Sequence, residues 1–353
     1  MRVAAIRLRP YLLPLVRPWV AASATLSERR GMLVGIGLGC GVTGWGDCAP
    51  LPSSGADGHD RAFAGLAEAA GSLAGRSVDD ALAALAALPC PEVRWALETA
   101  LLDAKARRLG VPLFRLLGGG DGGLDAVAVN GALGTLDQGC AARAEALLAR
   151  GFGVGKIKLG VFAMDAEIAG LRTLARRTGG RLRLRLDANR AWSEAEAVTL
   201  LDALDGLPVD GIEEPLAAPD IGALARLQAR YGFAVAVDES LPALGAKALL
   251  RGPAVRRLVV KPARLGGMAA TLRLAAMARA AGVELVLTSV VDSAIGVAAT
   301  AHLARALPCP AVHGLGTLDW LAADVAPPPL TAEGALILPG GPGLGLTPDG
   351  ETP

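Results

Sequence analysis

The chain lacks an excess of charge of either sign. Its 353 residues include 35 lysines and arginines against 34 aspartates and glutamates, a formal net charge of +1 at pH 7. Proteins that bind nucleic acid or an anionic membrane surface need a positive field, which this balance does not provide. The composition therefore predicts no nucleic-acid partner and no membrane partner, and it favours a small-molecule ligand.

Long hydrophobic runs are also missing. The longest uncharged stretch, residues 31–46, has 16 residues and several glycines, which is too short and too broken to span a bilayer. The N-terminal stretch MRVAAIRLRPYLLPL carries arginines inside its apolar run and a proline at position 10, unlike a secretory signal peptide. We therefore expect a cytoplasmic protein.

Cysteine is scarce. There are five cysteines, an odd number, and no Cys-x-x-Cys pair occurs among them. This pattern favours buried free thiols over a disulfide framework or a zinc site. The five are Cys40, Cys48, Cys90, Cys140 and Cys309.

The chain is long enough for two domains, and its 52% of hydrophobic residues can fill their cores. Short β-prone runs up to about residue 50 predict an antiparallel sheet, and apolar periodicity predicts helices over 62–88 and 92–109. A tail from about residue 326 returns to Pro and Gly turns. We expect an α/β protein: an α+β capping domain at 1–124, completed by the tail 326–353, and a (β/α)8-type barrel at 125–325.

Strand-like runs alternate with helical patterns through the predicted barrel. Residues 193–204, for example, begin with the capping-box pair Ser193 and Glu196. Eight strands are predicted, at Val127–Asn130, Val154–Leu159, Arg181–Leu186, Gly211–Glu213, Ala234–Val237, Leu258–Lys261, Glu284–Leu287 and Ala311–Leu315.

Ionisable residues recur at the ends of these runs: Lys158, Asp187, Glu213, Asp238 and Lys261. The steps between them are 29, 26, 25 and 23 residues. A strand, a turn and a crossover helix together take about 30 residues, so the spacing fits one charged group per barrel unit. The carboxyl ends of barrel strands form one mouth, where the chemistry of such barrels takes place. These groups should therefore converge there, which predicts an enzyme.

Three carboxylates on consecutive strands, Asp187, Glu213 and Asp238, need a cation to offset their mutual repulsion. Mg²⁺ prefers such oxygen ligands and keeps open positions for substrate, and Mn²⁺ is an expected substitute. Lysines lie on either side of the three acids, with Lys156 on the same strand face as Lys158. A nearby cation lowers the pKa of a lysine, so the set suits removal of a proton from the carbon next to a carboxylate.

Several strings make a family resemblance specific. KIKLG, DANRAW, IEEP, VDES and VVKPARLGG, in this order, with WALETALLDAKARRLGVPLFRLLGG before them, resemble the muconate-lactonizing-enzyme subgroup of the enolase superfamily. The resemblance implies that Asp187, Glu213 and Asp238 bind Mg²⁺ and that Lys158 is the acid/base. It also implies that Lys261 is the opposite lysine, with Lys156 in an electrostatic role. Glu214 would be a structural partner rather than a ligand.

Within the subgroup, GWGDCAPLP, TSVVDSAIG and GLGT are most similar to the o-succinylbenzoate synthases, dehydratases of menaquinone biosynthesis. This finer resemblance implies a carbon–oxygen lyase acting on a small carboxylate. An N-acylamino-acid racemase, a dipeptide epimerase or a muconate-type cycloisomerase would use the same groups and stays an alternative. Two departures matter: Asp47 stands where Glu is expected, and Thr317 replaces the first acid of the Asp-x-Asp pair of dipeptide epimerases, leaving Asp319.

Substrate contacts are predicted around the mouth, with a lid formed by Arg17–Arg30. For Gly266 and Gly267 the alternative interpretation is that glycine permits tight packing after a barrel strand. For the polar residues after the seventh strand the alternative is that they cap the following helix. A catalytically dead barrel that serves as a scaffold is a further alternative, although no position of the charged set is broken. The substrate and the oligomeric state, a homo-oligomer included, stay open. The predicted contacts are Asn189, Gly266, Gly267, Ser289, Asp292 and Ser293.

Overall fold

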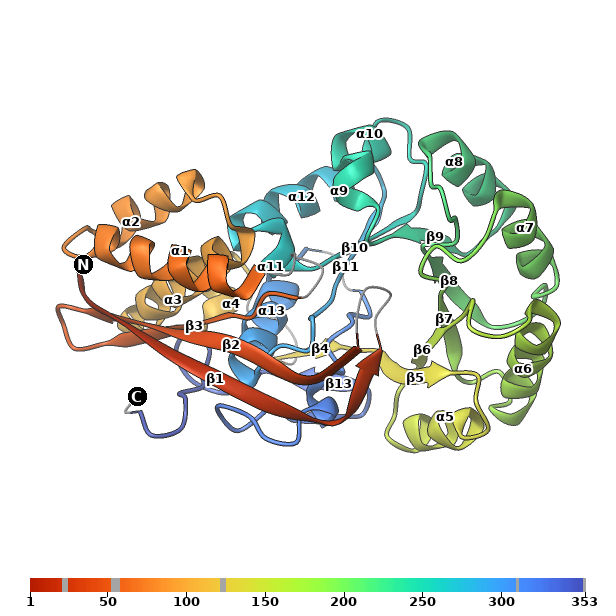
Figure 1. The fold of residues 1–353 in the computed structure, drawn as a ribbon, viewed down its shortest axis with the longest axis horizontal. Helices are drawn as coiled ribbons and strands as arrows, with labels where there is room; N and C mark the ends of the chain where they lie inside the picture. Colours follow the sequence, from red (N-terminus) through yellow and green to blue (C-terminus); the bar gives the residue numbers. More distant parts are fainter. Residues whose placement is uncertain (21–24, 52–57, 121–124, 309–310, 352–353) are drawn as a thin grey trace.

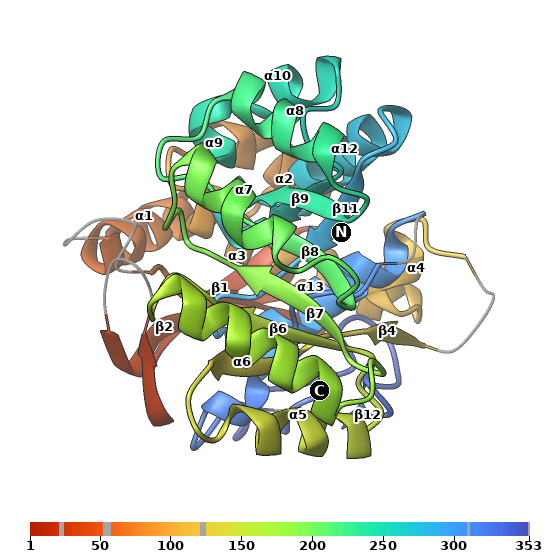
Figure 2. The same ribbon diagram turned by 90° about the vertical axis from the view of Figure 1, so that its right-hand side faces the viewer.

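The computed structural model describes residues 1–20, 25–51, 58–120, 125–308 and 311–351 (Figure 1). An antiparallel sheet with its helices stands beside a curved parallel sheet whose helices lie on its outer side, as Figures 1 and 2 show. In these ranges, no helix combines the length and the apolar character needed to cross a membrane. These two sheets confirm the α/β barrel with an N-terminal capping domain that the sequence predicts.

The capping domain is built on three antiparallel strands in the order β1-β2-β3. Helix α3 packs on β3 so closely that glycine is required: a Cβ at Gly44 would lie 2.2 Å from the Ala100 carbonyl oxygen, and one at Gly46 would lie 2.0 Å from that of Ala96. The predicted helix over 62–88 breaks after Leu73, and α2 restarts with Ser77 as its N-cap. The elements are β1 (Val3–Val20), β2 (Thr25–Leu38), β3 (Thr43–Cys48), α1 (Gly58–Leu73), α2 (Val78–Ala84), the 3-10 turn Leu85–Ala87, α3 (Pro91–Leu109) and α4 (Leu113–Leu116).

Seven parallel strands form the barrel sheet, in the order β5 to β11 along the chain. Their short runs of Val, Leu and Ile are buried, because helices cover one side and the barrel interior the other. Helix α7 begins at the predicted capping box of Ser193 and Glu196. The strands are β5 (Gly131–Thr135), β6 (Val154–Lys158), β7 (Arg183–Asp187), β8 (Val209–Glu213), β9 (Ala234–Val237), β10 (Arg257–Val260) and β11 (Glu284–Leu287). The helices are α5 (Cys140–Ala149), α6 (Met164–Arg177), α7 (Glu194–Asp202), α8 (Ile221–Arg230), α9 (Leu241–Leu244), α10 (Ala246–Arg251), α11 (Pro262–Leu265), α12 (Met268–Ala280) and α13 (Ala294–Ala306).

The first and eighth predicted strands need correction. The first barrel strand is β5, while β4 (Ala126–Ala128) pairs antiparallel with β13 (Ala335–Ile337) of the tail. Both runs are short and apolar, so the sequence pattern could not assign them to different sheets. In place of the eighth predicted strand, the structure has isolated β-bridges. Gly314 pairs with Thr288 on one side, and His313 pairs with Val129 on the other.

The tail returns to the capping domain, as predicted. The Leu344 amide donates to Asp103 Oδ1 at 2.7 Å, and Arg9 donates to the Asp349 carbonyl at 2.7 Å. The remaining elements of the tail are the 3-10 turn Leu318–Trp320 and β12 (Thr331–Ala332).

The described cysteines are free thiols, as predicted. Cys48 and Cys140 are buried and Cys90 is half-buried, but Cys40 is exposed in the turn between β2 and β3, which corrects the prediction of burial there. Cys309 lies outside the described residues.

Candidate active site

Strand register brings the predicted acids and amines together. Lys158 pairs with Asp187 across β6 and β7, and Asp187 pairs with Glu213 across β7 and β8. Glu213 pairs in turn with residue 236 of β9, so Asp238 follows just beyond the same edge, and Lys261 directly follows β10. Parallel strands in register present their last residues at one rim, so five strand ends meet there.

The lysine ammonium groups lie among the carboxylates. Lys156 Nζ is 3.0 Å from Asp187 Oδ2 and 2.5 Å from Glu213 Oε2, and thus bridges two neighbouring strands. Lys261 Nζ contacts both carboxylate oxygens of Asp238. Three acids on consecutive strand ends are therefore flanked by lysines, and two of these lysines contact the acids through their ammonium groups.

Burial and neighbouring charges together shift the pKa values of this cluster. Burial raises the pKa of Glu213, which is 1% exposed, while the charge of Lys156 opposes that shift. For Lys156 burial acts to lower the pKa, but the charges of Asp187 and Glu213 outweigh burial and raise it. The charges of Asp187 and Glu213 therefore favour the protonated, positively charged form of the Lys156 side chain.

Backbone strain marks the same rim. Asn189, Arg190 and Glu214 have φ values of 43°, 63° and 46°, in the left-handed region that non-glycine residues seldom adopt. The Arg190 amide donates to the Glu214 carbonyl at 2.7 Å, so the two strained turns support each other. Residues in such conformations cluster at functional sites, where the surrounding structure imposes them.

The conformation of Glu214 carries its side chain to the loop of residues 238–240. Its carboxylate accepts from the Asp238 amide at 2.7 Å, the Ser240 amide at 2.8 Å and the Ser240 hydroxyl at 2.6 Å. Glu214 is 2% exposed and thus a structural support beneath Asp238, in agreement with the sequence interpretation.

Whether the site suits a metal ion depends on its donor set. As the side chains stand, no three carboxyl, imidazole or thiol groups within the described ranges are arranged to hold a metal ion. A cation nevertheless already occupies the space between Asp187 and Glu213, namely the Lys156 ammonium. Carboxylates from three adjacent strand ends are the oxygen donors that Mg²⁺ takes, so the residues fit a divalent cation once the lysine head moves aside.

Two of the predicted substrate contacts lie at the rim. The Asn189 amide donates to Asp187 Oδ1 at 3.2 Å, and its side chain donates to Glu239 Oε1 at 3.2 Å. Ser289 Oγ lies 2.6 Å from Thr317 Oγ1, which joins the ends of the seventh and eighth strand positions. Sequence reasoning missed Glu239, although the acid pair in VDES was a signal for it.

The other four predicted contacts face the capping domain. A Cβ at Gly266 would lie 2.3 Å from Arg94 Nη2, and one at Gly267 would lie 1.9 Å from Glu98 Oε2, so both glycines permit close packing of α3. Asp292 and Ser293 are buried, and Ser293 caps α13. The packing and capping alternatives therefore describe these four residues, whose substrate contact stays a prediction.

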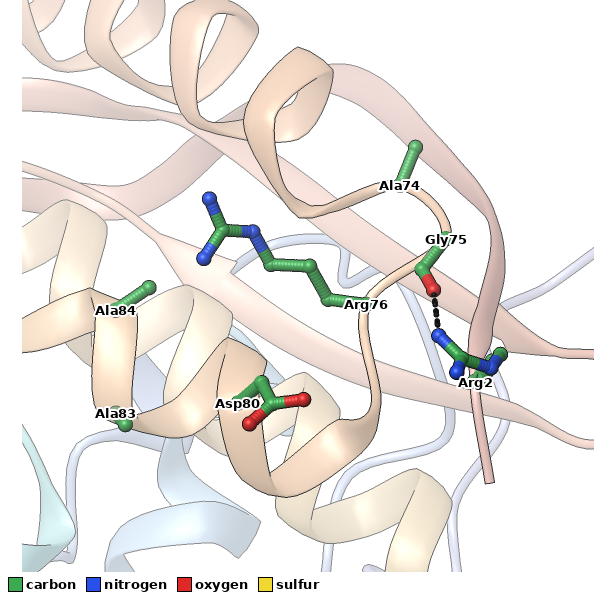
Figure 3. Close-up of a pocket in the computed structure, with 7 residues that line it drawn as sticks. All are labelled: Arg2, Ala74, Gly75, Arg76, Asp80, Ala83 and Ala84. Carbon is green, nitrogen blue, oxygen red and sulfur yellow. Dashed lines mark hydrogen bonds between the residues drawn. The ribbon is translucent and has the colours of Figure 1, made fainter.

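Cavities elsewhere do not coincide with this rim. A pocket of about 650 Å³ lies on the capping domain between Arg2, Arg76 and Asp80 (Figure 3). A smaller one of about 180 Å³ lies between Arg17, Trp320 and α5. None of the strand-end acids or lysines lines either pocket. Part of the predicted lid, residues 21–24, falls outside the described residues.

Family models match both parts of the chain. Residues 5–118 match the mandelate racemase / muconate lactonizing enzyme N-terminal domain, and residues 139–352 match the enolase C-terminal domain-like family. With the strand-end acids and lysines in place, this chain belongs to the enolase superfamily, in its muconate-lactonizing-enzyme subgroup.

Several proteins similar to this chain are epimerases and cycloisomerases. The L-Ala-D/L-Glu epimerase of Bacillus subtilis is 28% identical over 98% of this chain and 97% of its own, and its substrate-liganded structure gives a TM-score of 0.88. The chloromuconate cycloisomerase of Pseudomonas putida is 34% identical over 72% of this chain and 70% of its own. A dipeptide epimerase from Methylococcus capsulatus, solved with Mg and the dipeptide L-Arg-D-Lys, is 30% identical over 98% of this chain and 99% of its own, with a TM-score of 0.88.

Proposed function

We propose that this chain removes the proton α to a substrate carboxylate with the help of Mg²⁺ and then eliminates water from the β position, as o-succinylbenzoate synthase does in menaquinone biosynthesis. The observation that carries the proposal is three acids on consecutive strand ends flanked by lysines, with the Lys156 ammonium between Asp187 and Glu213 and that of Lys261 on Asp238.

The metal would be held by Asp187, Glu213 and Asp238. When bound, Mg²⁺ or Mn²⁺ supplies a Lewis acid that favours negative charge on the substrate carboxylate. The similarity to an epimerase solved with Mg supports this assignment.

The chain's own residues divide the proton transfers. Lys158 takes the α-proton and returns it to the departing β-hydroxyl on the same face, so one group serves both half-reactions. Lys156 adds positive charge on the same strand face. Asn189, bonded to both Asp187 and Glu239, orients the acids of the rim.

Lys261 separates dehydration from racemisation. Racemisation needs Lys261 to exchange a proton with the substrate on the second face, whereas dehydration needs only its positive charge. Lys261 contacts both carboxylate oxygens of Asp238, one of the proposed metal ligands.

A second candidate, an N-acylamino-acid racemase, is favoured by the similarity to epimerases over 98% of the chain. A dipeptide epimerase is less well supported, because no acid pair is available to hold an ammonium group. Thr317 is bonded to Ser289, and Asp319 is paired with Arg150 at 3.1 Å, with 72% of its side chain exposed. Muconate-type cycloisomerisation would use the same lysines.

The test is an assay of the purified protein against a panel, with and without EDTA. The panel contains the hydrated precursor of o-succinylbenzoate, N-succinyl amino acids, dipeptides and muconate. We expect EDTA-sensitive formation of the aromatic product from the precursor. Racemisation of N-succinyl amino acids without dehydration would replace the first candidate with the second, and inactivity toward every carboxylate would overturn both.

A further inference from the structure

A buried polar cluster joins the capping sheet to the loop that follows β11. It contains one residue from each capping strand: Tyr11 on β1, Arg29 on β2 and Asp47 on β3. Arg29 is 1% exposed and Asp47 is 2% exposed. Burying a guanidinium and a carboxylate is unfavourable unless both are hydrogen-bonded. Their hydrogen-bond partners therefore indicate which segments the cluster holds in place. The chemistry proposed above uses none of these three residues.

Arg29 holds carbonyl groups on two sides of the domain boundary. Its Nη1 donates to the Pro50 carbonyl at 3.0 Å and its Nη2 to the Ala49 carbonyl at 2.6 Å, both in the capping domain. Its Nε donates across the boundary to the Val291 carbonyl at 3.1 Å, and Asp292 Oδ1 lies 4.0 Å from Nη2. The planar guanidinium thus links the segment that follows β3 to the loop that follows β11.

Asp47 makes the second tie to the same loop. Its Oδ1 accepts from the Tyr11 hydroxyl at 2.7 Å. Its Oδ2 accepts from the Ser293 hydroxyl at 2.7 Å and from the Ser293 amide at 3.3 Å. Ser293 is also the N-cap of α13, so the first turn of that helix is fixed against the capping sheet.

The loop held by these two ties is strained. Val291 has a φ of 60°, and a β-branched side chain makes this region unfavourable by about 1–3 kcal/mol. Asp292 Oδ2 accepts from the Val290 amide at 3.2 Å, which closes the turn. A conformation that the residue itself disfavours has to be imposed from outside, and the Arg29 bond to the Val291 carbonyl is positioned to impose it.

The loop begins at the rim of the site. Ser289 lies two residues before Val291, and its amide donates to the Gly314 carbonyl at 3.2 Å where the barrel closes. Its hydroxyl is bonded to that of Thr317. A change at Val291 therefore moves the Ser289–Thr317 pair.

We propose that Arg29 and Asp47 are positioning residues: by holding residues 290–293 in their strained conformation, they fix the Ser289–Thr317 pair at the substrate rim. The link to substrate rests on the proposed function, whereas the link between the two domains does not.

Hydrogen exchange of the full chain, read by mass spectrometry on peptides covering 287–294, tests the link between domains without any substrate. Arg29→Met should speed exchange in these peptides by about five- to hundredfold, the range that corresponds to the strain at Val291. Peptides of β7 to β9 should not change. Arg7→Met is the matched control, an arginine of the same sheet with an exposed side chain paired to Glu351; it should leave 287–294 at the wild-type rate.

Rescue distinguishes positioning from general destabilisation. Glycine adopts a φ of 60° without strain, so Val291→Gly should reverse most of the Arg29→Met effect on exchange and on KM for the substrate that the panel identifies. If Arg29→Met does not fold, Arg29→Lys is expected to give a smaller effect in the same direction, because one ammonium cannot reach all three carbonyls. Wild-type exchange at 287–294 in the folded Arg29 variant, or faster exchange throughout the chain without rescue, would overturn the proposal. If the protein acts on no member of the panel, the proposed function is wrong. The hydrogen-exchange result then still tests the link between the two domains.

Discussion

The support that Glu214 gives to Asp238 leads to a quantitative prediction. Glu214→Ala removes the acceptor of two backbone amides, the half-buried one of Asp238 and the buried one of Ser240. Each buried donor left without a partner costs about 1–3 kcal/mol, so the free energy of unfolding should fall by about 2–6 kcal/mol. Alanine at a φ of 46° relieves no strain, so nothing offsets this loss.

Glu214→Gln is the matched variant. Its amide oxygen can accept from both backbone amides, and the Ser240 hydroxyl can turn to accept from its NH₂ group. We expect a loss below about 1 kcal/mol by urea denaturation. Divalent-cation affinity, measured by calorimetric titration, should fall by about ten- to a hundredfold in Glu214→Ala and much less in Glu214→Gln. Equal losses of stability and affinity in the two variants would show that the hydrogen bonds of the Glu214 carboxylate are not the cause.

Three further predictions concern charge at the site and at the domain boundary. Lys261→Arg should retain most dehydratase activity, whereas Lys261→Ala should lose it by about a hundredfold or more; equal loss in both variants would contradict a purely electrostatic role. EDTA should abolish turnover and excess Mg²⁺ should restore it, and activity that survives chelation would remove the metal from the mechanism. Burial and the charge of Asp47 raise the pKa of Asp292 to about 7, so its contribution to stability is present below about pH 4 and lost as pH rises through 7. Asp292→Asn should therefore flatten the decline in the free energy of unfolding between about pH 4 and pH 7, by up to ~4 kcal/mol, and parallel pH curves for variant and wild type would contradict this.

Sequence spacing was sufficient to predict the architecture and the convergence of the charged groups. Once Lys158, Asp187 and Glu213 are assigned to successive parallel strands, the repeat of the barrel places them at one rim, and the observed register agrees. The capping box of α7 was equally visible, because it depends on residues only three positions apart.

Features that depend on contacts distant in sequence were not predictable. Ser293 meets Asp47 across 246 positions, and no local pattern indicates which polar residue a loop will face. The antiparallel pairing of β4 with β13 is a similar case, since short apolar runs carry no information about their partner strand. The left-handed conformation of Glu214 is not visible in the sequence pattern, and only the packed structure reveals that its carboxylate supports Asp238.

The central claim is that the strand-end carboxylates share one divalent cation. Its most direct test is a titration of the purified chain with Mn²⁺, followed by the loss of free-ion signal in electron paramagnetic resonance. We predict one saturable site per chain that Mg²⁺ competes for, weakened at least tenfold by Glu213→Gln and by Asp238→Asn. The absence of a saturable site, or a site that both substitutions leave intact, would contradict the account.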